Sequence, residues 1–215
     1  MTLTLYYSAA SAPCRSVLLA AKALGLDLEL KTLNVRAGEN KTPEFLKLNP
    51  QHTIPTLVDD GFSVWESRAI ITYLANKYGK GSSLYPEDPQ TRALVDQRLY
   101  FDIGTLSARY VEYYYPKFFG KQVDEDRKTK LEDALQFLDT FLEGQTYVAG
   151  DSLTLADLSL VATVSTIELS DVDLSKYDNI KRWYETMQKT APGYKEANQD
   201  GVDALKAILE SMSKQ

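Results

Sequence analysis

The first part of the chain alternates between short apolar runs and stripes of apolar residues at helical spacing. Residues 2–7 form a compact apolar run, which predicts a short buried strand. The apolar positions of residues 17–24 fall on one face of a helix, and Pro13 suits its first turn because no backbone N–H is needed there. Residues 28–33 alternate as a second strand would, and residues 42–44, Thr-Pro-Glu, are typical of a helix start.

A hairpin signal comes next. Asp60-Gly61 separates two short apolar runs, residues 56–59 and 62–65, and this pattern predicts two antiparallel strands joined by a tight turn. Ser67 is then placed to cap a helix that runs to Tyr78. The predicted order is βαβαββα, with the first two strands parallel and the last two antiparallel. This arrangement is thioredoxin-like.

The strand pattern ends at residues 80–88, a segment rich in glycine, serine and proline. Beyond it, apolar residues follow helical spacing in two stripes: Leu99, Ile103, Leu106, Tyr110 and Tyr113, then Leu131, Leu135, Leu138 and Leu142. A capping pattern, with Thr154 as N-cap and Asp157 at the third helical position, begins a further helix. We therefore predict a thioredoxin-like α/β domain over residues 1–79, a linker over 80–88 and an all-α domain over 89–215.

Composition and charge exclude several kinds of function. The chain has 215 residues and a net charge of −6, which argues against broad nucleic-acid binding because that requires a basic face. No apolar run has the length of a transmembrane helix, and the N-terminal MTLTLYY lacks a signal-peptide pattern, so we expect no membrane partner and a cytoplasmic location. With Cys14 and His52 as its single cysteine and histidine, the chain is expected to hold no intrachain disulfide and no metal.

The segment Ser11-Ala12-Pro13-Cys14 looks like a C-x-x-C redox motif in which serine replaces the first cysteine. Ser11 lies between the first predicted strand and helix, where backbone N–H groups and the helix dipole favour an anion. Taken alone, Ser11 indicates a helix cap. As a hydrogen-bond donor to an anion at this place, Ser8 is a nearby alternative to Ser11. Cys14 has no second sulfur and is interpreted as a small apolar packing residue. The sequence leaves open whether Arg15 meets an anion or faces solvent.

Several local motifs carry a resemblance to a known family. They are SAPCRS, NPQHTIPTL, WESRAI and ITYLANKYG in the first domain, and QRLYFD, YYYP, FLEGQ and GDSLTLADLSLVATVST in the second. With these motifs the chain resembles the cytosolic glutathione transferases, and within them the delta class, known mainly from arthropods. The resemblance implies a homodimeric enzyme that uses glutathione as co-substrate and conjugates it to small hydrophobic electrophiles in detoxification. The alternatives are an epsilon-like enzyme, a non-catalytic carrier of hydrophobic ligands, and a redox or scaffold protein with the same fold.

The resemblance assigns a glutathione site to Ser11, His52, Thr53, Ile54, Pro55, Glu66, Ser67, Arg68 and Asp102. In this assignment Ser11 is the catalytic residue, because its hydroxyl holds the glutathione sulfur as a thiolate. A cis Ile54–Pro55 bond and His52 would meet the cysteinyl and glycine parts of glutathione. Glu66 would pair with the γ-glutamyl ammonium, and Ser67 and Arg68 with the carboxylate beside it. Asp102 would reach the γ-glutamyl amine across the dimer interface.

The family places its electrophile pocket where this chain has Ala12, Pro13, Leu33, Ser107, Tyr110, Tyr113, Tyr115 and Phe119. An aromatic helical stripe is often plain core, so we expect about half of the aromatics near residues 110–119 to line the pocket and the rest to pack. The chain departs from the family at three places. Asn40 replaces a frequent histidine, Ser107 replaces a frequent aromatic, and the C-terminal helix around residues 203–212 lacks the aromatics that often cover the pocket.

Overall fold

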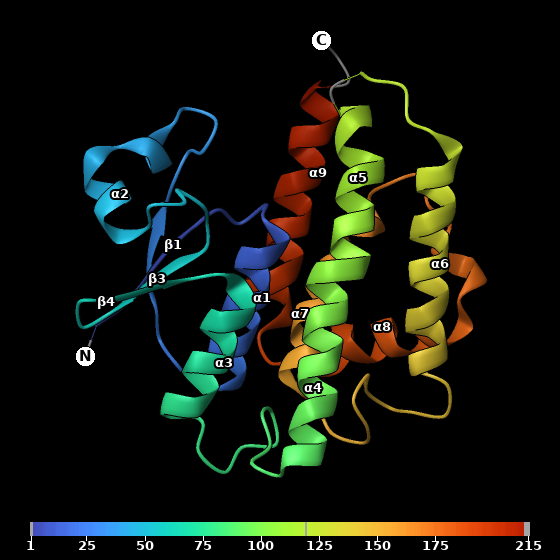
Figure 1. Cartoon of the computed structure of the whole chain (residues 1–215), viewed down its shortest axis with the longest axis horizontal. Coiled ribbons are helices and arrows are strands. Elements are labelled where there is room, and N and C mark those ends of the chain that lie inside the picture. Colours follow the sequence, from blue (N-terminus) through green and yellow to red (C-terminus); the bar gives the residue numbers. More distant parts are fainter. Residues whose placement is uncertain (1, 119, 213–215) are drawn as a thin grey trace.

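The computed structural model describes residues 2–118 and 120–212. A four-stranded sheet forms the centre of the first domain, in the order β2-β1-β3-β4 (Figure 1). The strands are β1 Leu3–Tyr7, β2 Glu29–Thr32, β3 Thr56–Asp59 and β4 Phe62–Trp65. β1 pairs in parallel with β2, and β3 pairs antiparallel with both β1 and β4. The predicted directions of the first and last strand pairs are therefore confirmed.

The helices of the first domain lie on both sides of this sheet. They are α1 Ala12–Ala23, the 3₁₀ turn η1 Glu39–Lys41, α2 Pro43–Leu48 and α3 Ser67–Tyr78. α1 and α3 lie between the sheet and the helical domain, and α2 lies on the other side (Figure 1). The predicted cap of α2 is confirmed, since the Thr42 side chain accepts a hydrogen bond from Phe45 N–H. The predicted cap of α3 is wrong by one residue: Glu66 is the N-cap and Ser67 is the first helical residue.

The described part of the second domain is helical apart from its connections. Its helices and turns are α4 Pro89–Phe101, η2 Asp102–Leu106, α5 Ser107–Phe118, α6 Glu125–Phe141, α7 Leu155–Ile167, η3 Leu174–Lys176, α8 Asp178–Thr190, η4 Lys195–Gln199 and α9 Asp200–Met212. Within these residues, no helix combines the length and apolar character needed to cross a membrane. The fold class predicted from the sequence, a thioredoxin-like domain followed by an all-α domain, is confirmed.

One predicted helical stripe is interrupted. η2 is a π-helical turn between α4 and α5, and its wider turn breaks the spacing that would align the stripe. Leu99, Leu106 and Tyr113 are buried as predicted, but Ile103 is 39% exposed. The second stripe has no such interruption, and all four of its leucines are buried in α6 and just after it.

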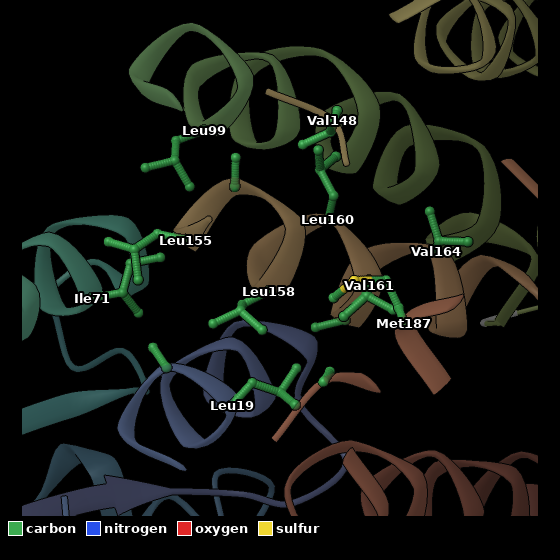
Figure 2. Close-up of a cluster of buried hydrophobic side chains, with 14 of the residues drawn as sticks. Leu19, Ile71, Leu99, Val148, Leu155, Leu158, Leu160, Val161, Val164 and Met187 are labelled. Atoms are coloured by element: carbon green, nitrogen blue, oxygen red, sulfur yellow. The ribbon is translucent and has the colours of Figure 1, made fainter. Parts of the chain in front are cut away.

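Helix α7 is the centre of a hydrophobic core that both domains share. Every residue of α7 except Thr166 is buried, which is typical of a helix surrounded by other elements. Figure 2 shows Leu158 of α7 near Leu19 of α1, and Leu155 near Ile71 of α3. The predicted capping residues hold the start of α7, because the Asp157 carboxylate accepts from Thr154 N–H at 2.9 Å. The positions of α1 and α3, and so of the residues that begin them, are fixed against this one helix.

Candidate active site

Ser11 is the N-cap residue of α1, at the end of the loop that follows β1. Its N–H donates to the Ser8 carbonyl at 3.1 Å, and its carbonyl accepts from Arg15 N–H at 3.0 Å. The side chain is half-buried and makes no capping hydrogen bond to the helix. The hydroxyl therefore lies at a helix N-terminus, where an anion is favoured, without being used as a cap.

Cys14 lies one turn further into α1 and is completely buried. Burial raises the pKa of its thiol to about 11, and hydrogen bonds with the Ser11 side chain and the Ser8 backbone offset only part of this effect. The thiolate is the reactive form of cysteine, and at neutral pH almost none of Cys14 is ionised. Its burial agrees with the interpretation of Cys14 as a packing residue.

Arg15 meets neither an external anion nor solvent, the two alternatives that the sequence left open. Its side chain is fully buried and reaches the last turns of α7. Nη2 donates to the Ala162 carbonyl at 3.1 Å and to Thr166 Oγ1, and Nη1 lies 3.4 Å from Ser165 Oγ. Burial lowers the pKa of Arg15 to about 10, so the guanidinium is still charged at neutral pH.

Two buried asparagines hold the turn that carries His52 and Thr53. Asn49 Nδ2 donates to the Thr53 carbonyl and to Thr56 Oγ1, both at 3.0 Å. Asn40 Nδ2 donates to the His52 carbonyl at 2.6 Å, while the His52 residue itself is exposed. Asn40, which stands where the family often has a histidine, thus holds the backbone of His52, a residue predicted to contact glutathione.

Three described residues other than glycine have positive φ: His52 at 49°, Asp60 at 47° and Glu66 at 69°. Asp60 is at the tip of the β3–β4 hairpin, where an Asp-Gly turn requires this conformation. His52 and Glu66 have no hairpin to explain theirs, and strained backbone conformations of this kind collect at functional sites. The Ile54–Pro55 peptide bond is cis, as the resemblance implied.

Arg68 and Asp102 form an ion pair between the two domains, in which the carboxylate is buried and the Arg68 side chain is 13% exposed. Arg68 Nη2 lies 2.5 Å from Asp102 Oδ2, and Nη1 donates to Ser67 Oγ at 2.9 Å. Asp102 also accepts from Ser159 at 2.6 Å and from Thr163 at 2.8 Å, and it is 0% exposed. Both carboxylate oxygens of Asp102 thus accept hydrogen bonds within this chain, and they fix the Arg68 side chain. The predicted contact of Asp102 with glutathione across a dimer interface stays a prediction.

A crevice of about 380 Å³ runs along the surface between α3 and α4. Glu66 and Arg68 line it from the first domain, and Tyr100 and Ile103 line it from the second. Tyr100 is 75% exposed, so a large aromatic side chain beside this crevice is open to solvent. Two of the residues predicted to bind the γ-glutamyl end thus open onto a surface that both domains form.

Tyr113, predicted for the electrophile pocket, belongs to the core instead. Its ring is 2% exposed, and its hydroxyl donates to Asp171 at 2.9 Å. Lys117 pairs with the same carboxylate at 2.7 Å. This correction has a simple cause: the side chain points toward the segment after α7, where its hydroxyl has a partner.

The other predicted pocket residues have different degrees of exposure. Half-buried are Ala12, Pro13, Leu33, Ser107 and Tyr110. Tyr110 stacks on Tyr114 with ring centroids 5.4 Å apart. Tyr115 is 58% exposed, and Phe119 lies outside the described residues. The structure thus provides half-buried groups at the starts of α1 and α5 and directly after β2.

Sequence reasoning missed several polar residues that support these groups. They are Asn49, Ser159, Thr163, Ser165 and Asn198, all buried. The hydroxyl residues of α7 had a signal, because polar side chains inside a helix that is apolar all round need hydrogen-bond partners. Asn49 precedes a proline in NPQHTIP, a turn signal that predicts no particular contacts. Nothing in the sequence near Asn198 indicated its role.

The geometry defines a two-domain protein whose thioredoxin-like half has Ser11 at the N-terminus of its first helix. Residues 1–76 match the family described as "Glutathione S-transferase, N-terminal domain", and residues 105–190 match "Glutathione S-transferase, C-terminal domain". The chain therefore belongs to the glutathione S-transferase family, whose members transfer groups to glutathione.

Solved structures give the class. A delta-class glutathione transferase from Nilaparvata lugens is 57% identical, with a TM-score of 0.95 over 98% of this chain and 99% of that one. A Bombyx mori glutathione transferase is 47% identical, with a TM-score of 0.92 over 97% and 98%. Glutathione transferase E6 from Drosophila melanogaster is 41% identical, with a TM-score of 0.90 over 98% and 97%. Within its family the chain is a delta-class protein.

Proposed function

We propose that Ser11 donates a hydrogen bond to the sulfur of bound glutathione and holds it as a thiolate. The observation that carries this proposal is the Ser11 hydroxyl at the N-terminus of α1, unused as a cap. A free thiol has a pKa of about 8.5, and lowering it by two units takes about 2.7 kcal/mol of differential stabilisation. A charge-assisted hydrogen bond together with the helix N-terminus can supply stabilisation of this size.

The thiolate then attacks a hydrophobic electrophile. Its electron pair forms the new C–S bond, and with a halo-nitroarene the halide departs with the electrons of the C–halogen bond. The thiol proton has already passed to solvent, so Ser11 forms no covalent bond and ends unchanged. Conjugation of this kind makes hydrophobic compounds more polar, and we infer that it serves detoxification.

Glutathione would extend from the His52 turn to the start of α3. In this arrangement its glycine carboxylate lies at His52, and its cysteinyl backbone lies along Thr53, Ile54 and Pro55. The buried asparagine support of this turn and the positive φ of His52 favour a fixed ligand contact there. The γ-glutamyl end would meet Glu66, Arg68 and the N–H groups that begin α3. The Arg68–Asp102 pair supports this end, because it holds the guanidinium beside the crevice.

The electrophile would lie beside Ala12 and Pro13, facing Leu33, Ser107 and Tyr110. All five are half-buried, as the wall of an open apolar pocket would be. Ser107 provides less bulk than an aromatic residue. We therefore expect a pocket that is wider than one with an aromatic residue at position 107 and that admits bulky electrophiles.

A homodimer is part of this proposal. The exposed Tyr100 and Ile103 lie on the α3–α4 surface, next to Glu66 and Arg68, where a second subunit would cover them. Light scattering at assay concentration should give twice the monomer mass of 24.2 kDa. An active protein of monomer mass would remove the dimer from the proposal.

The substitution Ser11→Ala tests the catalytic assignment. Turnover of a chromogenic halo-nitroarene with glutathione should fall by about 10²-fold, because a well-placed donor to an anion is worth a few kcal/mol. Ser8→Ala is the matched control and should keep wild-type turnover. Normal turnover by a folded Ser11→Ala protein would reject the assignment. A wild-type protein that binds glutathione without turning over any electrophile would indicate the carrier function instead.

A further inference from the structure

The loop that carries Ser11 lies against the start of α9 with no room for a side chain between them. A Cβ atom on Gly201, the second residue of α9, would lie 2.3 Å from the Ala9 carbonyl oxygen and 2.6 Å from Arg15 Cδ. The φ of Gly201 is outside the left-handed region, so space and not backbone conformation requires glycine here. Because the nearest atom belongs to the backbone, no change of rotamer would relieve the clash.

A buried polar junction fixes the η4 turn that leads into α9. Asn198, three residues before Gly201, is 0% exposed, and its Nδ2 donates to Ser165 Oγ at 3.1 Å. The same hydroxyl lies 3.4 Å from Arg15 Nη1. One oxygen atom of α7 therefore connects α1 with the η4 turn that leads into α9, and Figure 1 shows α9 beside α1.

The loop is thus restrained at both ends. At its C-terminal end, Arg15 N–H donates to the Ser11 carbonyl at 3.0 Å, and the Arg15 side chain is bound to Ala162 and Thr166 of α7. At its N-terminal end, the Ala9 carbonyl rests against Gly201. A hydrogen bond to sulfur from Ser11 depends on where this short segment is held, because such bonds weaken steeply with displacement.

We propose that the all-α domain positions the Ser11 hydroxyl, with Gly201, Asn198, Ser165 and Arg15 as positioning residues. None of the four is assigned a contact with glutathione. Their effect reaches the sulfur through the backbone of residues 8–11, which cannot keep its place if the start of α9 moves toward it. This proposal rests on the proposed function, since it takes Ser11 as the donor to the thiolate.

The substitution Gly201→Ala tests the proposal, with Gly104→Ala as matched control. Gly104 is also a helical glycine outside the left-handed region, but a Cβ there would meet nothing within 4 Å. In Gly201→Ala the ionisation of the bound glutathione thiol should shift upward by about one pH unit, a tenfold change in the ionisation equilibrium. Turnover at neutral pH should fall at least about tenfold, since small misplacements of catalytic groups have effects of this size. Gly104→Ala should match the wild type in both.

The thiol ionisation, followed by ultraviolet difference absorbance, separates positioning from simple loss of stability. A variant that only unfolds more easily has a lower melting temperature, but its folded molecules ionise glutathione at the wild-type pH. If Gly201→Ala has a lower melting temperature but ionises glutathione at the wild-type pH and keeps wild-type turnover, the proposal is overturned. Glutathione affinity should change by less than about threefold, because the predicted contacts at residues 66–68 lie on another segment.

The substitution Ser165→Ala gives a second test that adds no atoms, in case Gly201→Ala does not fold. It removes the oxygen that Asn198 and Arg15 share, and it should shift the thiol ionisation in the same direction by a smaller amount. An unchanged ionisation pH in a folded Ser165→Ala protein would overturn the proposal. The same titration of Ser11→Ala distinguishes a failure of the positioning role from a failure of the proposed role of Ser11. If Ser11→Ala shifts the ionisation while Gly201→Ala and Ser165→Ala do not, only the positioning role fails.

Discussion

Asp102 and Arg15 are both fully buried charged residues that connect α7 with the first domain, but they are compensated in different ways. Asp102 has a partner of opposite charge, Arg68, and two hydroxyl donors on α7. Arg15 forms no ion pair with any carboxylate in residues 2–118 and 120–212. It meets the carbonyl of Ala162 and two hydroxyl groups near the C-terminus of α7, the end at which a helix dipole is negative.

This difference shows two ways to attach one helix to a neighbouring domain. A paired charge is stable only while both partners are present, because removal of one leaves the other buried and uncompensated. A charge held by helix carbonyl and hydroxyl groups leaves behind neutral acceptors that can still bond among themselves. The two sites should therefore respond differently to truncation, although both charges are equally buried.

The largest effect is expected for Asp102→Ala. The change leaves the Arg68 guanidinium without its carboxylate, and the free energy of unfolding should fall by about 3–5 kcal/mol. Asp133→Ala, which removes an exposed carboxylate from α6, should change it by less than about 0.5 kcal/mol. Denaturant titration of both variants measures the difference. A loss below about 1 kcal/mol for Asp102→Ala would show that the pair adds little and that the comparison with Arg15 is wrong.

A smaller effect is expected for Arg15→Met, which keeps much of the apolar volume and removes the charge. The Ser165 hydroxyl keeps Asn198 as a partner, and the Thr166 hydroxyl still donates to the Ala162 carbonyl at 2.8 Å. With no opposite charge stranded, the loss should be about 1–2 kcal/mol, the scale of a few net hydrogen bonds. The same denaturant titration applies. If Arg15→Met costs as much as Asp102→Ala, the neutral acceptors do not compensate each other as described.

Much of the first domain could be predicted from the sequence because its signals are local. Thr42 as a cap and Asp60-Gly61 as a turn act within a few residues, and the structure contains both. The cap of α3 was misplaced by one residue because Glu66 takes a positive φ that sequence preferences for Glu do not suggest. In the second domain, the π-helical turn at residues 102–106 exposed Ile103, and no spacing rule for α-helices anticipates such a turn.

The candidate site also combines features that local sequence signals predict with features that depend on distant residues. The placement of Ser11 at the N-terminus of a helix follows from a strand, a loop and a proline close together in the chain. The burial of Asp102 and Tyr113 depends on partners more than fifty residues away, Thr163 for Asp102 and Asp171 for Tyr113. Such contacts form only when the helices of the second domain pack, so a resemblance transferred along the sequence can name the residue and still miss its surroundings.

The central claim is that the protein lowers the pKa of bound glutathione through Ser11. The most direct measurement is a pH titration of the thiolate absorbance of glutathione bound to the wild-type protein and to Ser11→Ala. The thiol on the wild type should ionise about one to two pH units below the free thiol, and turnover should rise with pH through the same range. In Ser11→Ala most of this shift should be lost. A wild-type complex that ionises at the pH of free glutathione, or a Ser11→Ala complex that ionises as the wild type does, would contradict it.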